Sequence, residues 1–146
     1  MKIAKNGILI RTLAFAAVVT ATMMGAAPAR ADGWMPQPYH TNGITYISGG
    51  IGIDEENAIK AQAGNYNLKI TDADKQGQFT GGTNLVIRSN GGQDVIKVDN
   101  AGPMFDAQLP PGRYTVKASN GAQQEIRHIK ISEDKPVDMH LIWRQS

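Results

Sequence analysis

Three histidines are the side chains of this sequence best suited to acid–base chemistry or to metal binding. His40 lies in a proline-containing segment, whereas His128 and His140 lie in two consecutive segments of alternating polarity near the C-terminus. If the latter two face outward on adjacent strands, their imidazoles could begin a metal site. Zinc sites usually use three or four protein ligands, and no further ligand is evident. We therefore predict surface histidines, with no catalytic, cofactor or metal site.

Carboxylates occur in two other suggestive places. Asp99 and Asp106 flank the stretch NAGPMF, where a pair of acids could serve hydrolysis. The stretch from Asp72 to Gly77, DADKQG, resembles the start of a calcium loop, but Thr83 stands where the twelfth residue should be a bidentate Glu. Solvated loop residues are the simpler interpretation of Asp99 and Asp106, and a polar loop between strands is the simpler interpretation of DADKQG. Cysteine and a G-x-S-x-G nucleophile motif are also lacking in the sequence.

A glycine-rich stretch, YISGGIGIDEENAIKA from Tyr46 to Ala61, raises the question of a phosphate-binding loop. Such a loop needs a Lys and a Ser or Thr after the glycines, to reach the phosphates and the metal. Here Asp54, Glu55 and Glu56 follow, and they would occupy the positive helix end that a phosphate prefers. The stretch therefore predicts a tight strand-to-helix turn and no nucleotide partner.

The first 31 residues have the form of a secretory signal peptide. Lys2, Lys5 and Arg11 precede a short apolar run that ends in small residues and an A-x-A site at residues 29–31. The run is shorter than the roughly 20 residues that a membrane span needs. The alternative is a short membrane anchor. We expect cleavage after Ala31 and a periplasmic or secreted protein, of bacterial type, with no membrane span.

Removing this leader reverses the charge of the chain. The precursor has 15 Lys and Arg residues and 13 Asp and Glu residues. Four of the basic residues lie in the leader, which leaves eleven against thirteen, a formal net charge of −2. The sequence therefore predicts no basic patch and no nucleic-acid partner. Without cysteines, an exported domain also has no disulfides, so its core must hold the fold.

The order of elements begins with irregular sequence and one helix. Residues 32–43 contain two prolines and a turn-like Asn42-Gly43, which predicts a linker or arm on which Trp34 could dock. Residues 44–64 predict a short strand, the glycine turn and a helix from Asp54 to Ala63. Asp54 is the expected N-cap, and Gly64 is the expected left-handed C-cap.

From residue 65 to residue 146 the sequence alternates with period two and predicts a β-domain. About seven short strands are separated by turn signals every 8–12 residues, which is typical of an antiparallel sandwich. In the strand EIRHIKI, Ile126 is out of phase with Ile129 and Ile131 and predicts a bulge. The expected strands are YNLKIT, NLVIRS, DVIKVD, MFDAQL, RYTVKAS, EIRHIKI and VDMHLIW.

One hairpin resembles a known family. FDAQLPPGRYTVKAS, from Phe105 to Ser119, is similar to the LPPG-Y-V hairpin of carboxypeptidase regulatory-like domains, which are transthyretin-like or prealbumin-like sandwiches. In this motif Pro111 presets the first turn dihedral, Gly112 supplies a positive φ, and Tyr114 returns to the core. GITYISGGIGIDE, YNLKI and GPMF look more narrowly like small exported bacterial proteins that carry this domain, although Met104 replaces the more usual aromatic residue.

The resemblance implies a non-catalytic accessory module rather than a peptidase. We expect a mainly β protein with one seven-stranded antiparallel sandwich and a short N-terminal helix, which binds a protein or an envelope polymer. The alternatives are a small periplasmic hydrolase or transthyretin-like enzyme, and a metal-binding protein, each using His128 and His140.

Overall fold

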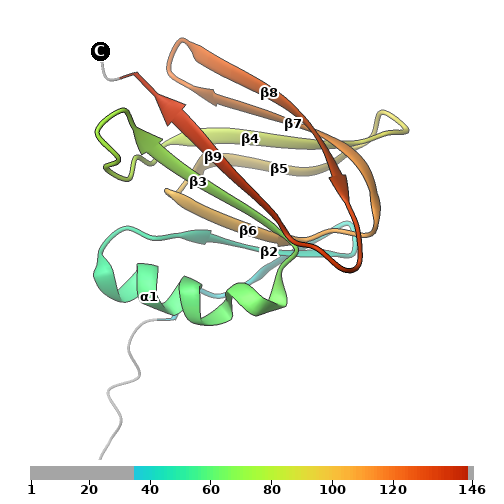
Figure 1. Ribbon diagram of the computed structural model, residues 1–146, viewed down its shortest axis with the longest axis horizontal. Coiled ribbons are helices and arrows are strands. Elements are labelled where there is room, and N and C mark those ends of the chain that lie inside the picture. The colour runs from blue at the N-terminus through green and yellow to red at the C-terminus, as the bar shows by residue number, and fades with distance from the viewer. Residues whose placement is uncertain (1–34, 145–146) are drawn as a thin grey trace, which may run out of the picture. The chain divides into compact units, whose positions relative to one another are not determined.

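The computed structural model describes residues 35–144, which belong to one compact unit of residues 32–146. Two β-sheets form it, together with one short helix (Figure 1). The first sheet has five strands in the order β1-β2-β6-β3-β9, and the second has four in the order β5-β4-β7-β8. The strands are β1 Tyr39–Thr41, β2 Ile44–Gly49, β3 Leu68–Asp74, β4 Thr83–Ser89, β5 Asp94–Ala101, β6 Met104–Gln108, β7 Gly112–Asn120, β8 Gln123–Ile131 and β9 Val137–Trp143.

All seven predicted sandwich strands form, but the sheets contain nine strands, so a single seven-stranded sandwich is not the architecture. β2 is the predicted short strand, and it lies between β1 and β6. The pairing is also not wholly antiparallel, because β3 and β9 run parallel in register from Leu68–Val137 to Asp74–Trp143. Alternation of polarity identifies a strand and its faces, but it carries no information on the direction of its partner.

β1 is the strand that the sequence did not predict. It lies within residues 32–43, which were expected to be an arm, and it pairs with β2 from Tyr39–Tyr46 to Thr41–Ile44. The turn between them has φ 48° at Asn42 and φ 75° at Gly43. Two positive values in succession are typical of the two-residue turns that join hairpin strands. Trp34 lies outside the described residues.

Helix α1 spans Ile53–Gln62 and continues into a 3-10 turn, η1, Ala63–Asn65. The N-cap position is Gly52 rather than the predicted Asp54, which lies in the first turn with Glu55 and Glu56. Gly64 lies in η1 and has no positive φ, so the predicted left-handed C-cap is also wrong. The 3-10 turn ends the helix instead, with the Tyr66 amide donating to the Ala63 carbonyl.

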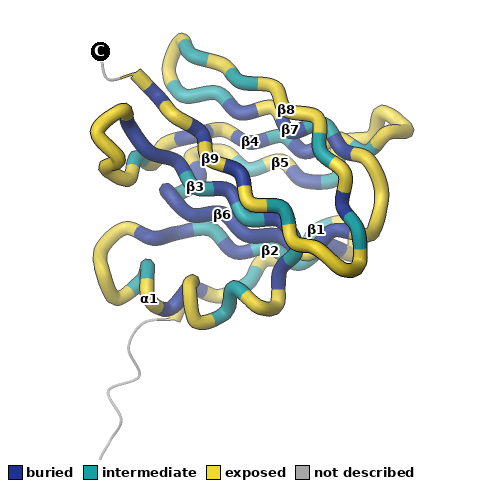
Figure 2. The backbone as a smooth tube through the Cα atoms, in the orientation of Figure 1, coloured by how far each residue is buried: buried dark blue, intermediate teal, exposed yellow. Residues whose placement is uncertain are grey.

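The core lies between the two sheets and is built from the inward positions of their strands. Figure 2 shows the alternation of buried and exposed positions along β9, where Met139, Leu141 and Trp143 are buried. Phe105 is the largest fully buried side chain. A second, smaller cluster joins α1 to the outer side of β2 and β6 and consists of Ile47, Ile59, Tyr66 and Met104.

The predicted bulge in β8 and the predicted LPPG hairpin can also be compared with the structure. β8 pairs with β7 without any register shift, so the predicted bulge at Ile126 is absent and its side chain is simply exposed. In the LPPG hairpin Tyr114 and Val116 are buried as predicted, and the Tyr114 hydroxyl donates to the Pro110 carbonyl at 2.7 Å. Gly112 has a positive φ of 157°, close to extended backbone.

Candidate functional site

The histidines of the described chain do not gather in one place. His128 lies on β8 and His140 on β9, at exposed, outward positions of different sheets, so the two side chains extend from opposite faces of the sandwich. His40 lies on β1, where its Nδ1 is 3.0 Å from the Thr45 hydroxyl. Within residues 35–144, no group of three or more His, Cys, Asp or Glu residues could hold a metal ion.

The calcium-like stretch is the end of β3, Asp72 to Asp74, followed by a polar turn. One oxygen of the Asp74 carboxylate accepts the backbone amides of Gln76 and Gln78, at 2.8 and 2.9 Å. The Gly77 amide donates to the Asp74 carbonyl, and Gly77 has φ 82°. Asp74 thus stabilises the tight connection that follows β3. Asp72 and Asp74 are themselves buried residues of this strand, so the prediction of a polar loop is wrong for the first half of the DADKQG stretch.

The glycine-rich stretch is a strand-to-helix turn. Gly50 and Gly52 have φ values of 94° and 92°, and the Glu55 carboxylate accepts the Ile51 amide at 2.8 Å. An acidic side chain of the helix therefore occupies the loop where a phosphate-binding loop would present its free amides. A Cβ on Gly102 would lie 2.5 Å from the Gly49 carbonyl oxygen. Position 102 therefore requires glycine because two backbone segments are in close contact there.

Asp99 and Asp106 lie on different sheets. Asp99 is exposed on β5, whereas Asp106 is buried on β6. Burial raises the pKa of Asp106 to about 6, and Lys69 lowers it while Asp138 raises it. The paired-acid arrangement suggested by the sequence is therefore not formed.

A basic surface is the feature that the fold creates from scattered residues. On β7 the residues Tyr114, Val116 and Ala118 face the core, so Arg113, Thr115 and Lys117 face outward. The neighbouring strand β8 places Lys130 opposite Arg113 and His128 opposite Thr115. On the other side, β4 places Arg88 opposite Thr115. We call this surface the basic face; it consists of Arg88, Arg113, Thr115, Lys117, His128 and Lys130.

The charges of the basic face are poorly compensated. Arg88 pairs with Asp94 at 2.6 Å, and that bond raises the pKa of Arg88 and lowers that of Asp94. Among the described residues, no salt bridge involves Arg113, Lys117 or Lys130. The outward positions of β4, β7 and β8 carry no carboxylate. These three side chains are therefore available for an external anion.

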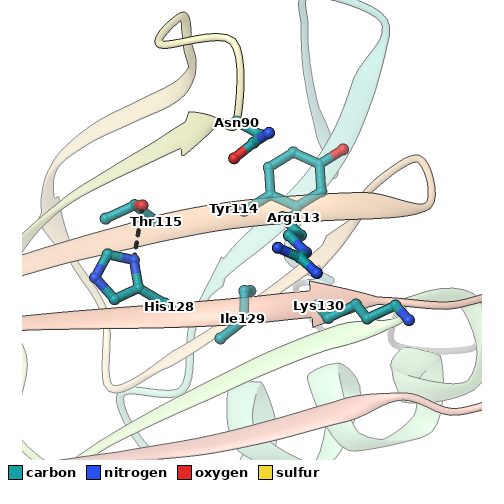
Figure 3. A pocket seen from close by; sticks show the side chains of 7 residues that line it. All are labelled: Asn90, Arg113, Tyr114, Thr115, His128, Ile129 and Lys130. Carbon is teal, nitrogen blue, oxygen red and sulfur yellow. Dashed lines mark hydrogen bonds between the residues drawn. The ribbon is translucent and has the colours of Figure 1, made fainter.

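A hollow of about 450 Å³ lies at one end of the basic face (Figure 3). Arg113 and Lys130 lie side by side along it, and Thr115 and His128 form its other end. The Thr115 hydroxyl and His128 Nδ1 are 3.1 Å apart, which fixes the ring against β7. Asn90 donates its backbone amide to the Arg113 carbonyl at 3.0 Å. Tyr114 and Ile129 complete the lining.

The chemistry of this hollow is recognition of anions. A guanidinium offers a planar set of donors that fits phosphate or carboxylate oxygens, and a lysine ammonium adds a mobile charge. The Thr115–His128 contact pairs a hydroxyl with an imidazole, but the residues that line the hollow include no carboxylate to orient the ring. The adjacent guanidinium and ammonium groups of Arg113 and Lys130 therefore suit the hollow to bind an anion.

Sequence reasoning missed this surface because it used the net charge. A net charge of −2 does not show where the charged side chains lie, because successive side chains of a strand point to opposite faces of its sheet. The signal that was available is the run RYTVK, which places Arg113, Thr115 and Lys117 on one face. The opposite charge gathers elsewhere, since Asp54, Glu55 and Glu56 lie in the first turn of α1 and Asp138 is exposed on β9.

Comparisons with known proteins give little further guidance. No family profile matches the chain, and no curated protein matches it either. A search of solved structures finds the Bacillus anthracis TIE protein, with a TM-score of 0.40 and 23% identity. The match covers 53% of this chain and 16% of that one, so the chain corresponds to a small part of its length. In the described part of the chain, no helix is long and apolar enough to cross a membrane.

Proposed function

We propose that this chain is an exported, non-enzymatic binding module that holds an anionic polymer of the cell envelope on its basic face. The observation that carries the proposal is the set of three cations, Arg113, Lys117 and Lys130, which lack a salt-bridge partner among the described residues. They lie on one open sheet surface, and the rest of the described chain carries most of the acidic residues. Such a separation favours a charged partner over a neutral one.

The geometry of a sheet suits a repeating ligand. Adjacent strands are about 4.8 Å apart and alternate residues on one strand are about 7 Å apart. Arg113 and Lys130 are direct cross-strand neighbours, and Lys117 follows Arg113 on the same face four residues later. Cations at these intervals can contact successive phosphate or carboxylate groups of one extended polymer. A flat surface of this kind also leaves the polymer free to continue beyond the module.

The family resemblance supports a binding role. The LPPG-Y-V hairpin from Leu109 to Val116 is similar to that of carboxypeptidase regulatory-like domains, which implies a transthyretin-like accessory module. The Tyr114 hydroxyl bond to Pro110 gives this hairpin a structural purpose. We do not propose the alternatives of a hydrolase or a metal-binding protein, because both require His128 and His140 together and these side chains extend from opposite faces.

Export is the second part of the proposal. The basic leader, apolar run and A-x-A site of residues 1–31 are typical of a cleaved signal peptide. The protein recovered from the periplasm or the medium is expected to begin at Asp32, and N-terminal sequencing measures this directly. Recovery of the chain with its leader still attached, in the membrane fraction, would contradict export by cleavage.

Binding is tested by titrating the exported protein with polyphosphate and with dextran sulfate, using neutral dextran as the control polymer. Arg113→Ala combined with Lys130→Ala should weaken polyanion binding by about tenfold, since two exposed ion pairs of roughly 0.7 kcal/mol each sum to about 1.4 kcal/mol. Lys75→Ala combined with Lys135→Ala removes the same charge from exposed turns outside the basic face and should have little effect. Binding should also fall steeply with salt.

Two results would overturn the proposal. Equal losses from the two double variants would show that only total charge matters. Absence of polyanion binding at low salt, with an unchanged melting temperature, would show that the basic face has no such ligand.

A further inference from the structure

A second recess lies at an open edge of the sandwich, away from the basic face. It has a volume of about 500 Å³ and runs between the β1–β2 hairpin and β5, the edge strands of the two sheets. Two hydrogen bonds hold its walls together. Asn42 donates its side-chain amide to the Val95 carbonyl at 3.0 Å, and the Gly102 amide donates to the Ser48 hydroxyl at 3.0 Å. We call this recess the edge trough.

Three aromatic rings lead from the core to this trough. Phe105 is 1% exposed and stacks on Tyr46, with 5.4 Å between the ring centroids. Tyr46 in turn stacks on Tyr39 at 5.2 Å, with the ring planes 19° apart. Tyr39 is 57% exposed although Tyr46 covers one of its faces, so its other face is open to a ligand. The ladder fixes the orientation of that terminal ring.

Hydrogen-bonding groups surround the exposed ring of Tyr39, which we call the aromatic platform. Glu55 lines the trough on the α1 side, and Lys97, Asp99 and Asn100 line it on the β5 side. Asn100 has φ 58°, an uncommon conformation for a residue other than glycine, and its amide donates to the Asn84 side chain at 2.9 Å. Backbone strain that the surroundings maintain in this way is often found at binding sites.

We propose that the edge trough binds a pyranose ring of a neutral polysaccharide, stacked on the exposed face of Tyr39. A pyranose has a C–H-rich face that packs on an aromatic ring and a rim of hydroxyl groups that need donors and acceptors together. The trough offers this combination of one flat apolar platform and a mixed polar rim. Apolar and aromatic lining with a few placed polar groups is the usual composition of a small-ligand site.

Other ligands fit the trough less well. A nucleotide could also stack on Tyr39, but its phosphates would meet the carboxylates of Glu55 and Asp99. A purely apolar peptide side chain would gain from Tyr39 but would desolvate the same charged groups without compensating them. A neutral sugar avoids both penalties.

The test uses uncharged cello- and chito-oligosaccharides added to the exported protein, followed by NMR. Chemical shifts of Tyr39, Asp99 and Asn100 should change on titration. Tyr39→Ala should weaken binding about tenfold, and Tyr39→Phe should keep most of it, because stacking needs the ring and not the hydroxyl. The matched control is Phe79→Ala, which removes another exposed aromatic ring, 43% exposed, from the loop after β3.

The outcomes separate this site from the basic face. Arg113→Ala with Lys130→Ala should leave oligosaccharide binding unchanged, so failure of the polyanion proposal does not affect this one. The inference is overturned if no oligosaccharide shifts the trough residues, or if Phe79→Ala and Tyr39→Ala weaken binding equally. It is also overturned if Tyr39→Phe loses binding as fully as Tyr39→Ala.

Discussion

The Asp72 carboxylate lies at one end of the core, 2% exposed, with no hydrogen-bond partner for either oxygen among the described residues. The Trp143 indole nitrogen and the Thr80 hydroxyl are also buried, and residues 35–144 provide no hydrogen-bond partner for either. Burial raises the pKa of Asp72 to about 6; the polar groups of the nearby Thr83 and Trp143 side chains lower it, although neither forms a well-aligned hydrogen bond with the carboxylate, and Glu125 raises it. At neutral pH this residue therefore holds a poorly compensated charge in the interior.

The effect of Asp72 ionisation on the free energy of unfolding follows from the linkage between proton binding and folding. The folded state binds the proton more tightly than the unfolded state, in which the Asp72 carboxyl has its ordinary pKa of about 3.8. Stability therefore falls as the pH rises through the range from about 4 to above about 6, and the full penalty is present at pH 7.5. Below the unfolded pKa both states are protonated and the penalty disappears.

Asp72→Asn is expected to stabilise the protein at pH 7.5 by on the order of 1–3 kcal/mol, because the amide is neutral at every pH. At pH 4 the variant and the parent should have nearly equal stability. Urea unfolding at both pH values measures the difference. Asp134→Asn makes the same chemical change at an exposed loop position and should have little effect. A destabilised Asp72→Asn at pH 7.5 would mean that the charge is compensated.

At the scale of elements, the sequence predicts most strands and the helix, but not how the strands pair. Alternation identified the strands from β3 to β9, and the acidic residues after Gly52 located α1, although its N-cap is Gly52 and not the predicted Asp54. The parallel pairing of β3 with β9 and the strand β1 were missed, because both depend on partners distant in sequence or on exposed residues such as Tyr39. The close contact of Gly49 with Gly102 was missed for the same reason.

Gly102→Ala should destabilise the protein by about 1–3 kcal/mol, since its Cβ would meet the Gly49 backbone at 2.5 to 2.8 Å and backbone atoms cannot move aside cheaply. Gly64→Ala is the matched control. Gly64 lies in η1 with nothing within 4 Å of an added Cβ and no positive φ, so that change should be neutral or slightly stabilising. The midpoints of thermal unfolding decide the matter, and equal midpoints for the two variants would show that β2 and the β5–β6 connection separate easily.

At the scale of the whole molecule, the distribution of charge matters more than its sum. The candidate site could be predicted only in part, because the outward alternation of Arg113 and Lys117 is readable from sequence whereas the positions of Arg88 and Lys130 beside them are not. Sheet order alone brings β4, β7 and β8 together. The acidic first turn of α1 and exposed Asp138 lie on elements that pack against or belong to the other sheet.

Ion-exchange chromatography tests this separation directly. With a formal net charge of −2, a chain of residues 32–146 would be expected to pass a cation exchanger at pH 7.5 and low salt. We expect retention on the cation exchanger as well as on an anion exchanger, because a column surface contacts one face of the molecule and interacts most strongly with the charges on that face. Arg113→Ala with Lys130→Ala should abolish retention on the cation exchanger only. Lys75→Ala with Lys135→Ala changes the net charge equally and should preserve it. Passage of the parent protein through the cation exchanger would show that the basic face does not act as a unit.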